Sequence, residues 1–93
     1  MAVDPYVIET LMPDLVGHDK QPSAFIVYLY LAHRVGRRAR LQVSLQTIAI
    51  ETGLSKSAVQ KSLRTLKRRR LVESTRESET STPEYAVLRP WRR

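Results

Sequence analysis

Apolar residues recur at helical spacing in two neighbouring stretches of the chain, residues 44–52 and 55–69. They follow the pattern i, i+3, i+4 in the first stretch and i, i+4, i+7 in the second, so those of each stretch share one face of a helix. The two apolar stripes consist of Leu45, Ile48 and Ala49, and of Val59, Leu63 and Leu66. The pattern predicts a short helix followed closely by a longer one, each burying a single face.

Polar residues and a glycine mark the ends of these two helices. Ser44 and Ser55 each precede an apolar stripe. A serine at that position accepts a hydrogen bond from a free amide of the first helical turn. Gly53 lies between the stretches, where a helix commonly closes with a left-handed residue that glycine adopts without a Cβ clash. We therefore expect a helix-turn-helix unit that turns at residues 53–55.

The outer face of the second helix carries only neutral polar and cationic side chains. At about 100° per residue from Val59, these side chains lie between about 100° and 200° around the helix axis. They are Ser57, Gln60, Lys61, Arg64 and Arg68. No carboxylate occurs from Ser55 to Arg70, whereas a helix face that serves only solubility usually mixes both signs of charge. The pattern favours a surface for an anionic partner.

A further helix is predicted near the start of the chain, over about residues 5–16. Asp4 and Pro5 form a favourable helix opening, because a carboxylate caps the first turn and proline needs no amide partner there. Apolar residues follow in pairs every four positions: Val7, Ile8, Leu11, Met12, Leu15 and Val16. Pro13 lies inside this pattern and should kink or interrupt the helix, which is expected to close near Gly17.

The run from Ala24 to Ala32 is apolar on all sides, so periodicity alone does not separate a buried helix from a buried strand. Its length, with Pro22 before it and Gly36 after it, favours a core helix over residues 23–35. A buried strand is the alternative.

Three short strands are expected in the remaining chain. Residues 41–43 alternate between apolar and polar, as in a short strand. Residues 71–75 and 84–89 read as two strands of a hairpin, joined by the polar loop 76–83.

The positive charge is concentrated in one part of the chain. The net charge is +7, and residues 34–70 hold eleven Lys and Arg against a single acid, Glu51. Such a concentration is typical of a surface that binds a polyanion. A solvated basic face is the plainer alternative.

The chain resembles winged helix-turn-helix proteins, above all bacterial regulators of the GntR type and the winged domains of plasmid replication initiators. The resemblance spans about residues 23–89 and rests on Ala49, Gly53, Ala58, Val59, Leu63, Leu66 and the run Arg70 to Glu73. It implies a mainly α fold with a small β-hairpin (α+β), a winged helix-turn-helix with an added N-terminal helix, in one domain over residues 1–93. Arg70 departs from the family pattern, which usually has glycine there.

The resemblance and the basic helix together imply sequence-specific binding of double-stranded DNA, as in a small bacterial transcriptional regulator. The N-terminal half of such a helix enters the major groove. Expected base contacts are Lys56, Ser57, Gln60, Lys61 and Arg64. Expected phosphate contacts are Ser55, Arg37, Arg38, Arg40, Arg68, Arg69 and Arg76.

The hairpin loop weakens this expectation. It carries Glu77 and Glu79 beside Arg76, and carboxylates near a phosphate strand reduce affinity. Either the loop stays clear of DNA with only Arg76 reaching it, or the loop faces a protein. The alternative function is a winged helix used for protein interaction, RNA binding or replication initiation.

Other kinds of site have little support in the sequence. The chain has no cysteine, and His18 and His33 lack a cluster at ligand spacing, so we expect no metal and no cofactor. No acid/base pair or glycine-rich phosphate loop indicates an enzyme, and no small-molecule ligand is evident. The chain lacks a signal peptide and a membrane-spanning run, which favours the cytoplasm.

A homodimer is possible through the N-terminal helix, because useful specificity on DNA normally needs two half-sites. The broad apolar stripe exceeds what one contact face requires, which suggests a dimer interface formed by Tyr6, Val7, Leu11, Met12 and Leu15. The alternative is that the whole stripe packs on its own core and leaves a monomer.

Overall fold

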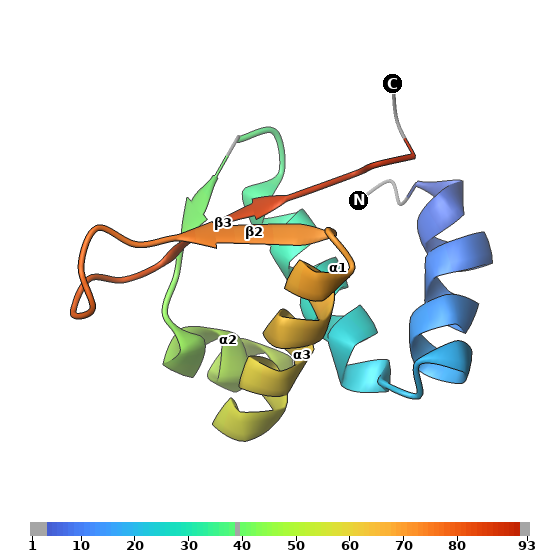
Figure 1. Cartoon of the computed structure of the whole chain (residues 1–93), viewed down its shortest axis with the longest axis horizontal. Coiled ribbons are helices and arrows are strands. Elements are labelled where there is room, and N and C mark those ends of the chain that lie inside the picture. The colour runs from blue at the N-terminus through green and yellow to red at the C-terminus, as the bar shows by residue number, and fades with distance from the viewer. Residues whose placement is uncertain (1–3, 39, 92–93) are drawn as a thin grey trace.

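The computed structural model describes residues 4–38 and 40–91, which form helices around a small sheet (Figure 1). The elements are η1 (Val7–Leu11), η2 (Pro13–His18), α1 (Pro22–Val35), β1 (Leu41–Gln42), α2 (Leu45–Thr52), α3 (Lys56–Arg68), β2 (Val72–Thr75) and β3 (Glu84–Val87). The sheet is antiparallel in the order β1-β3-β2. The expected α+β class, with helices and a small hairpin, is confirmed.

Helix α1 lies at the centre of the core. Proline is well tolerated in a first helical turn, where Pro22 stands, so the chain enters a helix here and not the alternative strand. Its buried side chains face α3, the N-terminal helix and the sheet, which explains why the run is apolar on all sides. The Tyr28 hydroxyl donates a hydrogen bond to the Leu88 carbonyl at 3.0 Å, which ties α1 to the chain after β3.

The connection between α2 and α3 has the expected local geometry. Ser44 Oγ accepts the Thr47 amide and Ser55 Oγ accepts the Ala58 amide, each at 3.1 Å. Gly53 closes α2 in the left-handed region with a φ of 80°. Both serine caps and the glycine turn are confirmed.

Arg70 occupies a left-handed position after α3, with a φ of 57°. The Leu71 amide donates to the Leu66 carbonyl at 2.9 Å and the Arg70 amide to the Lys67 carbonyl at 3.0 Å. These are the two hydrogen bonds of a Schellman motif, in which the left-handed residue is usually glycine. The chain therefore keeps the left-handed exit from α3 and bears the strain of a side chain there.

The N-terminal helix differs from the prediction in its hydrogen bonding and its end. Segments η1 and η2 are π-helical, and the last turn is closed by the Asp19 amide, which donates to the Asp14 carbonyl at 2.9 Å. The helix continues to His18, one residue past the expected end near Gly17. The left-handed residue of the following turn is Lys20, with a φ of 54°. Pro13 marks the junction of η1 and η2, and the helical ribbon runs on through it (Figure 1).

Trp91 joins the two ends of the described chain. Its ring stacks on Tyr6, with centroids 4.5 Å apart and planes at 14°. Its Nε1 donates a hydrogen bond to Asp4 Oδ2 at 3.1 Å. Trp91 therefore covers the start of the N-terminal helix.

Candidate nucleic-acid interface

Helix α3 has one buried side and one exposed side. Val59, Leu63 and Leu66 pack in the core. Two buried hydroxyls are satisfied by hydrogen bonds, because Ser62 donates to the Ala58 carbonyl and Thr65 donates to Gln21 Oε1, each at 2.7 Å. The buried flank of α3 therefore holds no unsatisfied polar side chain that a ligand would need to meet.

The exposed side of α3 carries the expected base-contacting residues. Lys56, Ser57, Gln60, Lys61 and Arg64 are all solvent-exposed. Within residues 4–38 and 40–91, none of their cationic groups forms an ion pair. Ser55, an expected phosphate contact, lies at the start of the helix with its Oγ 3.2 Å from Ser57 Oγ. These side chains are free to meet an external partner.

A cleft of about 260 Å³ separates α3 from the hairpin. Its polar lining consists of Gln60, Arg64 and Lys67 from α3, Arg76 from the hairpin loop, and Tyr85 from β3. Burial raises the pKa of the Tyr85 hydroxyl, and the Arg76 guanidinium partly offsets that rise. Tyr85 therefore stays neutral near pH 7, and the charged groups that line the cleft are all cationic.

Lys67 was missed by the sequence reasoning. At about 100° per residue Lys67 lies about 80° from Val59 around the helix axis, just outside the range of about 100° to 200° that the outer face covers. Its neighbour on the helix surface is Arg64, three positions earlier, which lines the same cleft. This edge of α3 lines the cleft because the hairpin lies opposite it. The helical pattern alone does not predict where the hairpin lies.

Arg76, in the hairpin loop, faces α3 and the start of α2. It lines the cleft described above and a second one of about 260 Å³, whose other residues include Ser44, Gln46 and Lys56. Its Nη1 donates to the Glu79 carbonyl at 3.2 Å, which holds the loop around it.

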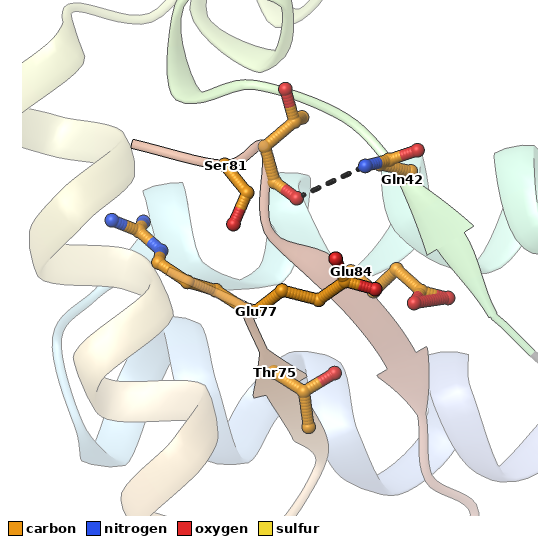
Figure 2. A pocket seen from close by; sticks show the side chains of 7 residues that line it. Gln42, Thr75, Glu77, Ser81 and Glu84 are labelled. Carbon is orange, nitrogen blue, oxygen red and sulfur yellow. Dashed lines mark hydrogen bonds between the residues drawn. The ribbon is translucent and has the colours of Figure 1, made fainter. Parts of the chain in front are cut away.

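The loop carboxylates lie elsewhere. Glu77 lines a third pocket of about 220 Å³ together with Gln42, Thr75, Ser81 and Glu84 (Figure 2). In this pocket Gln42 Nε2 donates to the Thr82 carbonyl at 3.3 Å. Neither Glu77 nor Glu79 lines the two clefts beside α3. Arg76 lines this third pocket as well as the two clefts, so the hairpin's cation lies between α3 and the acidic groups Glu77 and Glu84.

Glu51, the only acid of the basic segment, is already paired. Its carboxylate accepts hydrogen bonds from Arg34 and from the Tyr30 hydroxyl, and Arg34 Nη1 also donates to that hydroxyl at 2.8 Å. Burial, and then the hydrogen bond to Glu51, raise the pKa of Tyr30. The negative charge of Glu51 is therefore compensated next to α2.

The two arginines at the end of α3, Arg68 and Arg69, point in different directions. Arg68 is exposed without an ion pair in the described part of the chain, as a phosphate contact requires. Arg69 instead binds Asp14 and Asp19 of the N-terminal segment, with its Nη1 2.9 Å from Asp19 Oδ2. The guanidinium of Arg69 is therefore engaged within the chain, on the flank of α3 that faces η2, and a phosphate contact by Arg69 would have to replace these ion pairs.

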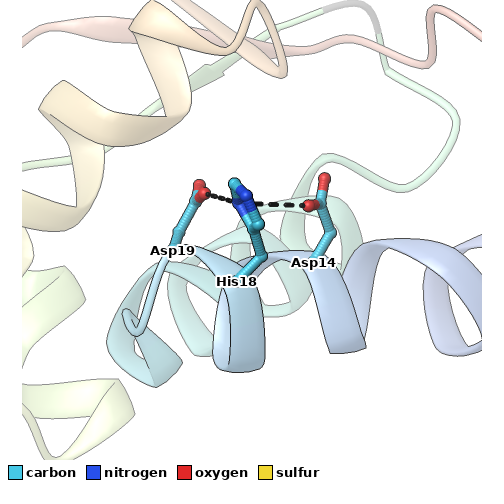
Figure 3. Close-up of side chains that lie close together, drawn as sticks. All are labelled: Asp14, His18 and Asp19. Atoms are coloured by element: carbon cyan, nitrogen blue, oxygen red, sulfur yellow. Dashed lines mark hydrogen bonds and ion pairs between the residues drawn. The ribbon is translucent and has the colours of Figure 1, made fainter.

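Asp14, His18 and Asp19 lie close together at the end of η2 (Figure 3). Their ligand atoms are within 4.8 Å of one another, a spacing compatible with a metal ion. Both carboxylates are bound by the Arg69 guanidinium, and the His18 side chain is 82% exposed. A metal ion would have to displace a cation already in place, so the cluster is best described as the anchor of Arg69.

Arg37, Arg38 and Arg40 are exposed but lie far from the cleft. They precede β1, whose Leu41 pairs with Tyr85, so they extend past the end of the sheet opposite the hairpin loop. Lys56 and Arg76 line one cleft near the other end. The structure does not bring the three arginines together with the expected base contacts, so any phosphates that they contact lie away from the cleft.

The expected dimer residues are mostly internal. Val7, Leu11 and Leu15 are 5%, 4% and 0% exposed in the chain's own core. Tyr6 stacks on Trp91, and only Met12 remains on the surface without such a contact. Val7, Leu11 and Leu15 therefore pack within a single chain and are not available to a dimer interface, which corrects the expected interface.

Within the described residues, no helix combines the length and apolar character that crossing a bilayer requires. Comparison of the chain with protein-family models, with curated proteins and with solved structures finds no match.

Proposed function

We propose that the chain is a winged helix-turn-helix protein that binds double-stranded DNA through α3 and the adjoining hairpin. The observation that carries this proposal is the cleft in which Gln60, Arg64, Lys67 and Arg76 converge without a lining carboxylate. An exposed helix of this kind fits the major groove, and cations beside it meet the phosphates of the groove edge.

The side chains of the interface divide by their chemistry. Gln60 pairs bidentately with adenine and Arg64 with guanine, which makes them the readers of sequence. Lys67 and Arg76 lie nearer the hairpin and serve as phosphate contacts, as does Ser55 with the free amides at the start of α3. In this role the chain acts in the cytoplasm as a small regulator.

Two copies of the chain pair through the exposed half of the N-terminal helix. Ile8, Met12 and Val16 follow one another at four-residue intervals and are 43%, 39% and 37% exposed. This helix lies on the side of the molecule away from the hairpin (Figure 1), so pairing there leaves α3 accessible. Pairing of this kind would supply the second half-site.

Selection of bound sequences from a random duplex pool, followed by titration at several salt concentrations, tests the proposal. Several neutralised phosphates give a log–log salt slope of about −4 to −7, since each contact releases counterions. A preferred site and a slope in this range are the expected result. Affinity that is independent of salt, or equal affinity for all sequences in the pool, would contradict the proposal.

A further inference from the structure

We propose that a second basic surface, which we call the arginine end, binds another segment of duplex DNA, so that one chain bridges two segments. The arginine end consists of Arg37, Arg38, Arg40, Arg70 and Arg89. This inference rests on the proposed function, because the first segment is the one held by α3.

The sheet brings these residues together from three separate parts of the sequence. β2 begins at Val72, which pairs with Val87 near the end of β3, and the Leu88 amide donates to the Leu71 carbonyl at 2.8 Å. Arg70 and Arg89 therefore leave neighbouring strands at the same end of the sheet. Residues 36–38 reach this end because β1 runs antiparallel to β3, and Figure 1 shows the segment after α1 above the strands, away from α2.

The five guanidinium groups are available to a ligand. Four of them belong to exposed residues and Arg89 is half-exposed. In the part of the chain that the structure describes, none of the five side chains forms an ion pair or a hydrogen bond, whereas Arg34 and Arg69 are both held by carboxylates. The nearest acid on the adjoining strand is Glu73, which is exposed on β2 opposite Ala86. The arginine end therefore keeps an excess of positive charge.

Arg70 gives an independent indication that a cation is needed here. It holds a left-handed backbone with a φ of 57°, where glycine is free of strain. Strain of this kind is often found at functional positions. A guanidinium that binds phosphate with two parallel hydrogen bonds is a reason for arginine at this position.

The arginine end lies at the opposite end of the sheet from the hairpin loop, with Arg70 just past the end of α3. The six steps from Arg70 to Arg76 include the four residues of β2 and span up to about 20 Å at about 3.3 Å each, which separates the arginine end from the hairpin loop. The major groove is only about 12 Å wide. A duplex seated on α3 and the hairpin therefore leaves Arg37, Arg38 and Arg40, past the opposite end of the sheet, open to other phosphates.

A capture experiment tests the bridge. Beads carry an immobilised duplex with the selected site, and the amount of protein added is smaller than the number of immobilised sites. A fluorescent duplex of random sequence is then added at physiological salt. We expect the parent protein to retain the fluorescent duplex. The variant Arg37→Gln/Arg38→Gln/Arg40→Gln should bind the immobilised duplex within about twofold of the parent but capture about tenfold less fluorescent duplex, because it loses three phosphate contacts.

A charge-matched control separates the two surfaces. Lys56→Gln/Lys61→Gln/Arg68→Gln removes the same charge from α3 and should weaken binding to the immobilised duplex itself. Circular dichroism melts establish that both triple variants are folded, as expected for changes at exposed positions.

Each remaining outcome decides between the two proposals. A parent that binds the immobilised duplex but captures no second one overturns the bridge and leaves the proposed function intact. Equal capture by the parent and the Arg37/Arg38/Arg40 variant also overturns it, since the second duplex is then held elsewhere, for example by a dimer. The bridge is also overturned if the arginine end retains anionic vesicles but does not retain a duplex. A parent that binds no duplex at all refutes the proposed function, and the bridge with it.

Discussion

The guanidinium of Arg69 binds the carboxylate of Asp19, with Nη1 3.0 Å and 2.9 Å from the two carboxylate oxygens. The same guanidinium binds Asp14 through its other terminal nitrogen. This arrangement fixes the end of η2 to the end of α3. It also turns one arginine of the basic run inward and leaves its neighbour, Arg68, on the surface.

Replacing Arg69 should therefore affect stability and not DNA binding. We expect Arg69→Ala to lower the free energy of unfolding by roughly 1–2 kcal/mol, because two partly buried carboxylates lose their shared cation. Arg68→Ala should change stability by less than about 0.5 kcal/mol and weaken duplex binding instead. Urea unfolding and duplex titration of both variants give the comparison, and equal stability of the two would argue against the anchor.

The left-handed conformation of Arg70 predicts an unusual gain from glycine. Arg70→Gly should be more stable than Arg70→Ala by about 1 kcal/mol, since only the alanine keeps a Cβ in the strained position. Both variants lose the guanidinium, so the difference in charge cancels. Thermal melts measure this difference, and an Arg70→Ala variant as stable as Arg70→Gly would show that the exit from α3 is relaxed.

Substitution by aspartate should have different effects at two neighbouring residues of the N-terminal helix. Leu11→Asp buries a charge in the core and should cost about 3 kcal/mol or more, enough to unfold much of the protein. Met12→Asp, on the surface, should leave the fold intact and shift the proposed dimer towards monomer. Sedimentation at tens of micromolar separates these effects. A parent protein that is already monomeric there would rule out pairing through Ile8, Met12 and Val16.

The cleft predicts two classes of DNA-binding variant. Gln60→Ala and Arg64→Ala should cost roughly 1–3 kcal/mol on the selected site and less on random duplex. Lys67→Ala and Arg76→Ala should weaken both duplexes by a similar factor and make the salt slope shallower by about one. Titrations on both duplexes decide the assignment, and the same ratio of losses for all four variants would contradict it.

The elements with local causes could be predicted from the amino-acid sequence. The serine caps at Ser44 and Ser55, the glycine turn at Gly53 and the apolar stripes of α2 and α3 act over a few residues, so spacing and residue type were sufficient. The concentration of positive charge in residues 34–70 was equally visible, because charge is a property of composition.

Tertiary structure decided which of those charges face a common partner. Arg69 looked like any other arginine of the run until Asp14 and Asp19, some fifty residues earlier, were packed beside it. Lys67 lines the cleft only because the hairpin folds back towards α3. Arg37 and Arg38 lie past the end of the sheet opposite the hairpin loop because β1 runs antiparallel to β3. These outcomes depend on contacts between distant segments, which helical periodicity does not encode.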